Sequence, residues 1–139
     1  MIELCTFRVG PLFLGIEVAR VQEVLRHLPI VRVPLAAPAI RGLINLRGQI
    51  VTAIDLRRRL GLADTPPASP ANVVVRTPHG PVSLVADDVG EVLGVSDEDF
   101  APPPETLRGP SRALYRGAYK LPGELLLHLV VDEVVRVPQ

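Results

Sequence analysis

Prolines and glycines interrupt this sequence so frequently that its regular elements must be short. The 139 residues include 15 prolines and 11 glycines but no tryptophan, and valine, leucine and isoleucine dominate the apolar remainder. Proline removes a backbone donor and glycine permits sharp turns, so both residues tend to end helices and strands. Valine and isoleucine are β-branched and favour strands. The sequence therefore predicts an all-β fold of short strands joined by turns, with one or two short helices.

Apolar runs between these breakers mark the expected strands. They are Leu4–Val9, Leu12–Val18, Val21–Leu25, Ile30–Val33, Leu43–Leu46, Gln49–Ile54, Asn72–Arg76, Val82–Ala86, Val89–Val95, Leu114–Lys120 and Glu124–Val131. One short helix is expected at Leu56–Leu60, because Asp55 can accept hydrogen bonds from its first amides and Gly61 can end it. The polar, proline-rich segment Asp97–Arg112 predicts an irregular excursion.

Two internal repeats predict two similar lobes. The motif Val21–Leu25 recurs 68 residues later at Val89–Leu93. The pattern Arg-Gly-x-x-x-Leu-x-Gly at 41–48 recurs 75 residues later at 116–123, and an apolar strand follows each copy. Two units are too few for a solenoid, so paired small barrels are the expected arrangement. Chance similarity between Val- and Leu-rich strands is the alternative.

The length and composition predict one cytoplasmic domain over residues 1–139, with the proline-rich stretch at 63–71 connecting its lobes. A chain of this length can bury a core without a disulfide or a metal. The single cysteine, Cys5, excludes an internal disulfide and fits a reducing compartment. No apolar run approaches the ~18 residues that a membrane span requires, and the first residues lack the pattern of a secretory signal.

Charge is balanced overall but unevenly distributed. Residues 1–60 carry nine arginines and four acids, whereas residues 61–139 carry six basic residues and eleven acids. The segment from Asp87 to Glu105 contains seven acids and no basic residue. Nucleic-acid binders usually present a basic stripe interleaved with aromatic residues, and the basic half has only Phe7 and Phe13. We therefore do not expect nucleic acid as a partner.

The titratable residues do not form a pattern typical of a catalytic or metal site. The three histidines, at positions 27, 79 and 128, are far apart and lack metal-ligand spacing. Cys5 lies in a strand-like run, where an inert buried thiol is expected. Asp87 and Asp88 could form a carboxylate pair, but adjacent strand residues face opposite sides, so polarity at a turn or strand end is the better interpretation. No glycine-rich phosphate loop is present, and no cofactor or metal is expected.

Arg47 is the residue that the fold alone does not require. It stands in Asn45-Leu46-Arg47-Gly48 between two expected strands, and its counterpart in the second copy of the repeat is Pro122. Glu23 has the counterpart Glu91, but that acid has no matching arginine. A Glu23–Arg47 pair would therefore exist in one lobe only. It could be an incidental exposed ion pair or a bidentate pair that positions a binding surface, and the residues alone leave both open.

Several motifs follow one another in a recognisable order from Phe7 to about Val135. They are Gly15-Ile16-Glu17, Val21–Leu25, Val33-Pro34 with Pro38, Ile40–Gly48, Ile54–Arg57, Val85–Val92 and the Pro102–Pro104 loop. In content and spacing they resemble the CheW family of chemotaxis coupling proteins. The most specific part is the block Gly42–Gly48 with Glu23 upstream.

This resemblance implies two intertwined five-stranded SH3-like β-barrels with a shared hydrophobic core. It also implies a non-enzymatic adaptor that couples the helical cytoplasmic tip of chemoreceptors to the regulatory domain of a CheA-type histidine kinase. The adaptor would associate with receptor arrays without inserting into the membrane. The receptor helix would dock in a groove between the barrels, at the positions Val21, Glu23, Gly42, Arg47 and Gly48. The family's Glu–Arg pair maps onto Glu23 and Arg47, which favours a functional role for that pair.

The chain also departs from the family pattern. Ser83 occupies a strand position where the family usually has glycine. The kinase-contact loop maps onto Ala101, Glu105 and Thr106, although family members typically carry a basic and an aromatic residue where this chain has Ala101 and Thr106. An alternative function is a scaffold of the same fold in a chemotaxis-like pathway that controls surface motility or development. A small β-barrel enzyme or ligand carrier would need clustered titratable groups, which the sequence does not predict.

Overall fold

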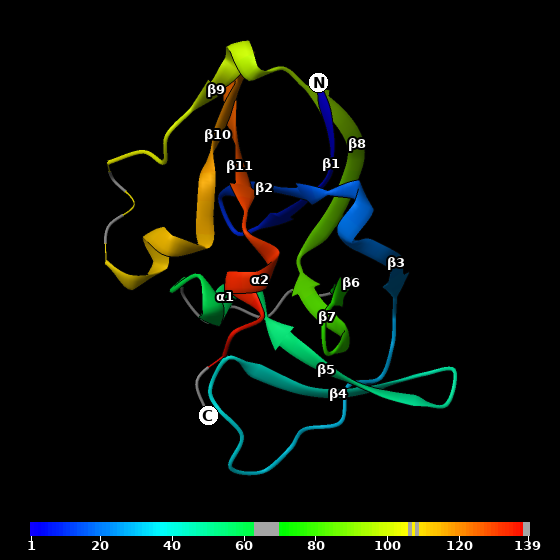
Figure 1. Cartoon of the computed structure of the whole chain (residues 1–139). Coiled ribbons are helices and arrows are strands. Elements are labelled where there is room, and N and C mark those ends of the chain that lie inside the picture. Colours follow the sequence, from blue (N-terminus) through cyan, green and yellow to red (C-terminus); the bar gives the residue numbers. More distant parts are fainter. Residues whose placement is uncertain (63–69, 106, 108, 138–139) are drawn as a thin grey trace.

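The computed structural model describes residues 1–62, 70–105, 107 and 109–137, and strands dominate this part of the chain (Figure 1). The strands are β1 (Ile2–Val9), β2 (Leu12–Glu17), β3 (Val21–Arg26), β4 (Ile40–Leu46), β5 (Gln49–Asp55), β6 (Ala71–Thr77), β7 (Gly80–Ala86), β8 (Asp88–Val95), β9 (Phe100–Ala101), β10 (Tyr115–Leu121) and β11 (Glu124–Leu129). The α-helices α1 (Leu56–Arg59) and α2 (Val131–Val134) have four residues each. Short 3-10 helices occupy Val18–Arg20, Asp97–Asp99 and Pro110–Leu114. The predicted all-β class is confirmed.

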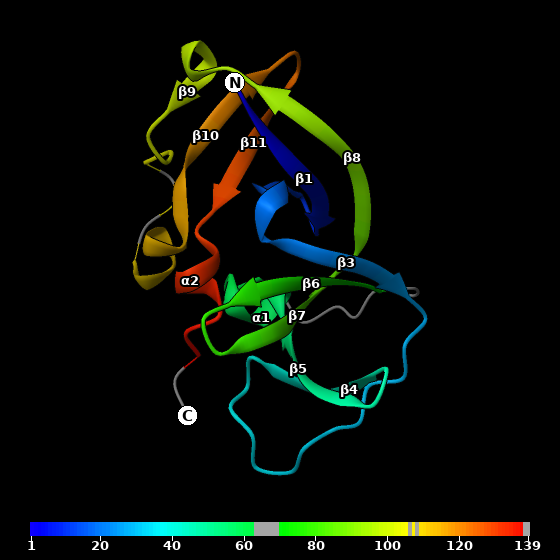
Figure 2. The ribbon, with the colours of Figure 1, turned by 45° about the vertical axis from the view of Figure 1, so that its right-hand side comes forward.

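The strands form two sheets, one in each lobe (Figure 1). The upper lobe contains the sheet β8-β1-β2-β11-β10-β9, and the lower lobe contains the sheet β3-β6-β7-β5-β4. Each sheet includes one parallel pair, β2–β11 above and β5–β7 below. The chain starts in the upper lobe, builds the lower lobe with β3 to β7, and returns along β8, which arches up beside β1 (Figure 2). The lobes are therefore intertwined, as expected.

The internal repeats correspond to equivalent strands of the two lobes. The hairpins β4–β5 and β10–β11 close through two-residue turns, with Leu46 paired to Gln49 and Leu121 paired to Glu124. In each hairpin the register shifts immediately before the repeated glycine, Gly42 or Gly117. A four-residue helix follows soon after each hairpin, α1 in the lower lobe and α2 in the upper lobe. The sequence repeat thus reflects a repeated topology.

The described residues form three buried apolar clusters, and only the largest of them joins the two lobes. One lies within the lower lobe and contains Ile44, Leu46, Val51, Ala53, Val74 and Val85. Another lies within the upper lobe and contains Leu4, Val95, Tyr119 and Leu126. The largest cluster combines residues of both sheets, such as Phe7 and Leu14 from above with Val73 and Val75 from below. Strand β6 serves two clusters because side chains alternate along a strand, so Val73 and Val75 face the shared core while Val74 faces the lower lobe.

A partly buried ion pair crosses between the lobes at Asp87, in the link from β7 to β8. The Asp87 carboxylate accepts hydrogen bonds from Arg57 Nη2 at 2.6 Å and Nε at 3.2 Å, and from the Gly10 amide at 2.7 Å. Asp88 points elsewhere and pairs with Arg26 at the surface. The expectation that these two aspartates do not form a carboxylate pair is confirmed. Asp87 therefore ties α1 of the lower lobe to the β1–β2 turn of the upper lobe.

Some expected boundaries were wrong. In the expected strand Ile30–Val33, only Val31 forms a bridge, to Leu43, because the neighbouring prolines cannot continue a ladder. The last strand ends at Leu129, and α2 begins where the sequence predicted further strand. Strand β9 and the 3-10 helix Asp97–Asp99 lie in the expected irregular segment Asp97–Arg112, and the 3-10 helix Pro110–Leu114 starts in it and delays the next strand to Tyr115. Most of the proline-rich connection, residues 63–69, lies outside the described residues.

Candidate partner-binding site

Arg47 and Gly48 form the tight turn between β4 and β5, as the sequence predicted. Both residues have positive φ angles, 52° for Arg47 and 87° for Gly48. Two successive positive φ values are typical of the type I′ turn that fits the twist of a hairpin. The Asn45 side chain accepts a hydrogen bond from the Gly48 amide at 2.8 Å and stabilises the turn. Arg47 thus occupies a conformation that non-glycine residues rarely adopt, which presents its side chain at the hairpin tip.

The Arg47 side chain joins the two edges of the lower sheet. Strands β3 and β4 are the outermost strands of that sheet, and Arg47 Nη2 donates a hydrogen bond to Glu23 Oε2 on β3. The side chain of Arg47 is 68% exposed and that of Glu23 is 21% exposed. The hydrogen bond from Arg47 lowers the pKa of the Glu23 carboxyl below its ordinary value, so the pair is ionic at neutral pH. The predicted one-lobe pair is present.

The other expected groove residues are not gathered around this pair. Val21 packs against the shared core at the start of β3, and its carbonyl accepts a hydrogen bond from Arg76 Nη1 at 2.6 Å. Gly42 is buried under the crossing backbone of Val31, so it shapes the lobe without presenting a surface of its own. Gly48 is exposed beside Arg47. The structure therefore brings together Glu23, Arg47 and Gly48.

Two exposed apolar residues close in sequence to the pair were not identified from the sequence. Ile50 on β5 is 64% exposed, and Val24 on β3 is 37% exposed. Strand alternation could have revealed Ile50, because Val51 and Ala53 point into the lower core and their neighbours must point outward. Val24 follows Glu23 on the edge strand β3 and faces the other side of that strand, whereas Ile50 lies on β5, the strand paired with the other edge strand, β4.

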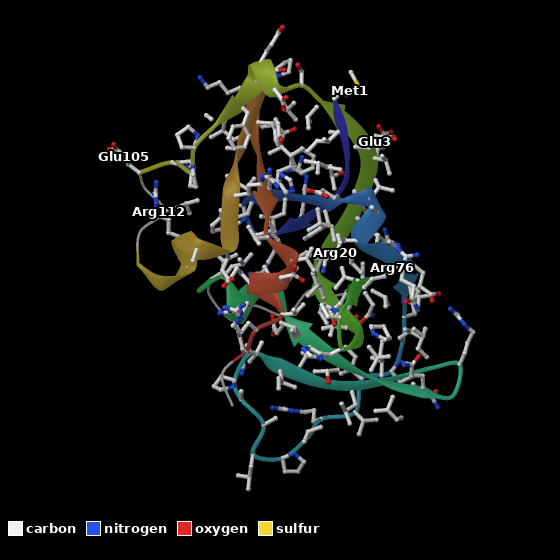
Figure 3. The ribbon with its side chains drawn as sticks, in the orientation of Figure 1. Met1, Glu3, Arg20, Arg76, Glu105 and Arg112 are labelled. Atoms are coloured by element: carbon white, nitrogen blue, oxygen red, sulfur yellow. The ribbon has the colours of Figure 1, made fainter. Side chains whose placement is uncertain are left out.

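Charged residues gather at a second place, where the lobes meet. A hollow of about 180 Å³ is lined there by Glu17, Arg20, Arg116, His128 and Asp132, together with Leu129, Val130 and Val131. Arg20 Nη2 donates to Asp132 Oδ1 at 2.6 Å and to the Arg76 carbonyl at 2.8 Å. Figure 3 shows Arg20 and Arg76 side by side at this junction. The hydrogen bond from Arg20 lowers the pKa of Asp132. Because Arg20 contacts both Asp132 on α2 and Arg76 near the end of β6, it links these two elements.

Buried His128 is expected to make the fold sensitive to mild acid. Its side chain is nearly inaccessible, and its Nδ1 has no hydrogen-bond partner among the described residues. Burial lowers the pKa of His128, although Glu17 at 3.8 Å partly opposes the shift and Arg116 reinforces it. Below a pH of about 6.5 the unfolded chain therefore binds a proton that the folded chain resists. As the pH is lowered below this value, the free energy of unfolding should therefore decrease, by at most about 1.4 kcal/mol per pH unit.

Urea unfolding between pH 7.5 and pH 5.5 measures this dependence. The variant His128→Gln does not titrate, so its unfolding free energy should change less over the same range. If the variant and the parent protein lose stability in parallel, His128 is not the responsible group.

The expected kinase-contact loop lies at the outer edge of the upper lobe. Ala101 pairs with Ala118 through the edge strand β9, and Glu105 projects outward from the loop that follows (Figure 3). Thr106 lies outside the described residues. Arg112 holds this loop in shape by donating to the carbonyls of Pro103, Pro104 and Leu107 at 3.1, 3.0 and 2.9 Å.

An exposed aromatic residue, Phe100, lies on this edge and was not among the predicted contact residues. Phe100 is 39% exposed and packs edge-on against Tyr119, with ring centroids 5.2 Å apart. Gly117 makes room for it, since a Cβ there would overlap the Phe100 ring. The signal in the sequence was the isolated Phe100 between acidic residues and prolines.

Within residues 1–62, 70–105, 107 and 109–137, no group of three or more His, Cys, Asp or Glu side chains is placed to hold a metal ion. No helix in that same part of the chain is both long and apolar enough to cross a membrane.

Comparisons with known proteins agree with this architecture. The CheW-like domain family model matches residues 3–139. The chain is 31% identical over 133 residues to the chemotaxis protein CheW of Rhizobium meliloti strain 1021, covering 95% of this chain and 86% of that protein. It is 33% identical over 116 residues to a probable chemotaxis protein CheW of Rhizobium etli, covering 83% of this chain and 75% of that protein.

A solved structure supports the fold. The scaffolding protein TtCheW from Thermoanaerobacter tengcongensis superimposes with a TM-score of 0.88 at 24% identity, covering 98% of this chain and 93% of that one. The matched relatives carry chemotaxis names, so the alternative of a surface-motility or developmental scaffold is not favoured. The chain therefore belongs to the CheW-like domain family and is a chemotaxis coupling adaptor.

Proposed function

We propose that this adaptor binds the helical cytoplasmic tip of chemoreceptors at the Glu23–Arg47 end of its lower lobe. The observation that carries the proposal is the ion pair itself, which exists in one lobe and is replaced by Pro122 in the equivalent turn of the other. The pair holds a guanidinium on an exposed hairpin tip in a fixed orientation, and Ile50 lies exposed nearby. An oriented charge beside apolar residues suits an amphipathic helix, which docks through apolar anchors and is aligned by polar contacts.

The same proposal assigns the kinase to the upper lobe. The regulatory domain of a CheA-type histidine kinase would contact the edge at Ala101, the loop at Glu105 and the neighbouring Thr106. An edge strand offers unpaired backbone groups, and Phe100 adds an exposed aromatic ring. The two surfaces lie on different lobes, so one chain could hold both partners. In this scheme residues 1–139 act as a single, non-catalytic domain at cytoplasmic receptor arrays, without membrane insertion.

The variant Arg47→Ala tests the receptor surface. It removes the oriented charge, but the pair is solvent-exposed, so the folded state should be nearly as stable as before. We expect roughly tenfold weaker binding to receptor-bearing membranes in co-sedimentation, with kinase binding retained.

A matched control is Arg26→Ala, which removes another exposed arginine–carboxylate pair from strand β3. Its binding to receptor membranes should be unchanged. Equal sedimentation of the parent protein and Arg47→Ala would contradict the assigned receptor surface. Loss of folded protein in Arg47→Ala would show that the pair is needed for the fold. Failure of the parent protein to bind both membranes and kinase would contradict the proposed coupling.

A further inference from the structure

Three arginines line a cavity in the lower lobe, under the loop that joins β3 to β4. The cavity has a volume of about 450 Å³ and continues into a shallower hollow of about 370 Å³ under the same loop. Both hollows are lined by Arg32, Arg41 and Arg58. The lining of the cavity also includes four apolar residues, Leu28, Ile30, Pro38 and Ile40. No pattern in the sequence groups these three arginines, which are 9 and 17 positions apart in the chain.

The one acid in the cavity is already engaged. Asp55 is buried, accepts hydrogen bonds from the amides of Arg57 at 3.0 Å and Arg58 at 3.4 Å, and thereby caps α1. Its other oxygen accepts from Arg41 Nη1 at 3.2 Å. Three guanidiniums and one carboxylate leave the cavity with a net charge of +2. Asp55 thus offsets one positive charge and holds the arginines in place.

Arg32 supplies the donors that remain for a ligand. Its guanidinium makes no hydrogen bond or ion pair with any residue that the structure describes, whereas Arg58 Nη1 donates to the Pro38 carbonyl at 3.2 Å. The backbone beside Arg32 is nevertheless fixed, because Val31 and Leu43 exchange two hydrogen bonds of 2.8 Å. The arginine is therefore an exposed side chain on an anchored segment at the cavity mouth.

We propose that this cavity binds a small organic phosphate monoester. A phosphate monoester carries a charge close to −2 at neutral pH, which matches the net charge of the cavity. The planar guanidinium fork pairs with phosphate oxygens through two parallel hydrogen bonds. The four apolar residues of the lining suit the organic group of the ester, and a volume of about 450 Å³ lies within the usual range for small-molecule sites.

This site is separate from the proposed receptor surface. Arg41 lies near the start of β4 and Arg47 follows its end, so the two are roughly 20 Å apart along the strand. The phosphate site therefore neither depends on the proposed receptor contact nor blocks it.

Titration of the full chain with phenyl phosphate, followed by calorimetry and by amide chemical shifts, tests the proposal. Saturable binding should perturb the amides of Arg32, Ile40, Arg41 and Arg58. Arg32→Ala should fold normally and bind about tenfold more weakly, because a charge-assisted pair is lost. Arg26→Ala removes an arginine from β3 outside the cavity, and its affinity should be unchanged.

Three further probes establish the ligand class. Inorganic phosphate should bind more weakly than phenyl phosphate because it has no organic group to contact the apolar lining residues, and benzoate should bind more weakly because it carries one charge. A phosphoserine peptide that binds more tightly than phenyl phosphate would overturn the assignment to a small molecule. Absence of saturable binding, equal affinity for benzoate, or equal losses in Arg32→Ala and Arg26→Ala would overturn the site.

Discussion

Gly42→Ala is expected to lower the free energy of unfolding by about 3 kcal/mol or more. A Cβ at this position would overlap the Val31 carbonyl oxygen and lie 2.8 Å from its carbon. The obstacle is backbone, which cannot rotate away as a side chain would. The segment would have to lift from β4, and the two hydrogen bonds between Val31 and Leu43 would be lost. Urea unfolding monitored by circular dichroism measures the change.

The matched control is Gly123→Ala in the equivalent hairpin of the upper lobe. Gly123 has a φ of +80°, and a Cβ there meets no atom within 4 Å. Only the left-handed backbone conformation disfavours alanine at this position, so the free energy of unfolding should fall by about 1–2 kcal/mol. Equal destabilisation by the two variants would show that the crossing of Val31 over β4 adds nothing beyond ordinary glycine strain.

Asp87→Ala is expected to lower the free energy of unfolding by about 2–4 kcal/mol. The substitution removes two hydrogen bonds from Arg57 and one from the Gly10 amide. The side chains of Arg57 and Asp87 are only 15% and 22% exposed, so water replaces these contacts incompletely. Because the contacts bridge the lobes, hydrogen exchange should accelerate in the β1–β2 turn and in α1. Asp87→Asn should cost less, since an amide oxygen can still accept from Gly10.

The adjacent Asp88→Ala provides the comparison. Asp88 pairs with Arg26 at the surface, where both side chains are substantially exposed. Removing it should leave stability and hydrogen exchange nearly unchanged. If Asp87→Ala behaves like Asp88→Ala, the contacts at Asp87 do not hold the lobes together.

Much of the candidate receptor site could be predicted from the sequence. The repeat aligned Arg47 with Pro122, which isolated the arginine as a residue that the shared fold does not need. The turn at Arg47 and Gly48 followed from local backbone chemistry, because Gly48 permits a sharp turn between two apolar strands. The burial of Gly42 could not be predicted from the sequence. Its burial depends on Val31, which crosses from a segment that the sequence predicted to be a regular strand.

Local chemistry was sufficient for the all-β class, the two-lobe repeat, the Asp55 cap of α1 and the turn that carries Arg47. These features depend on neighbouring residues or on the alternation of side chains along a strand, so the sequence expresses them directly. Long-range packing settled the rest. Whether Arg47 meets Glu23, and whether Arg32, Arg41 and Arg58 share one cavity, depends on how the sheet curls and where the β3–β4 loop crosses it. Those contacts join residues distant in the chain, and no local pattern encodes them.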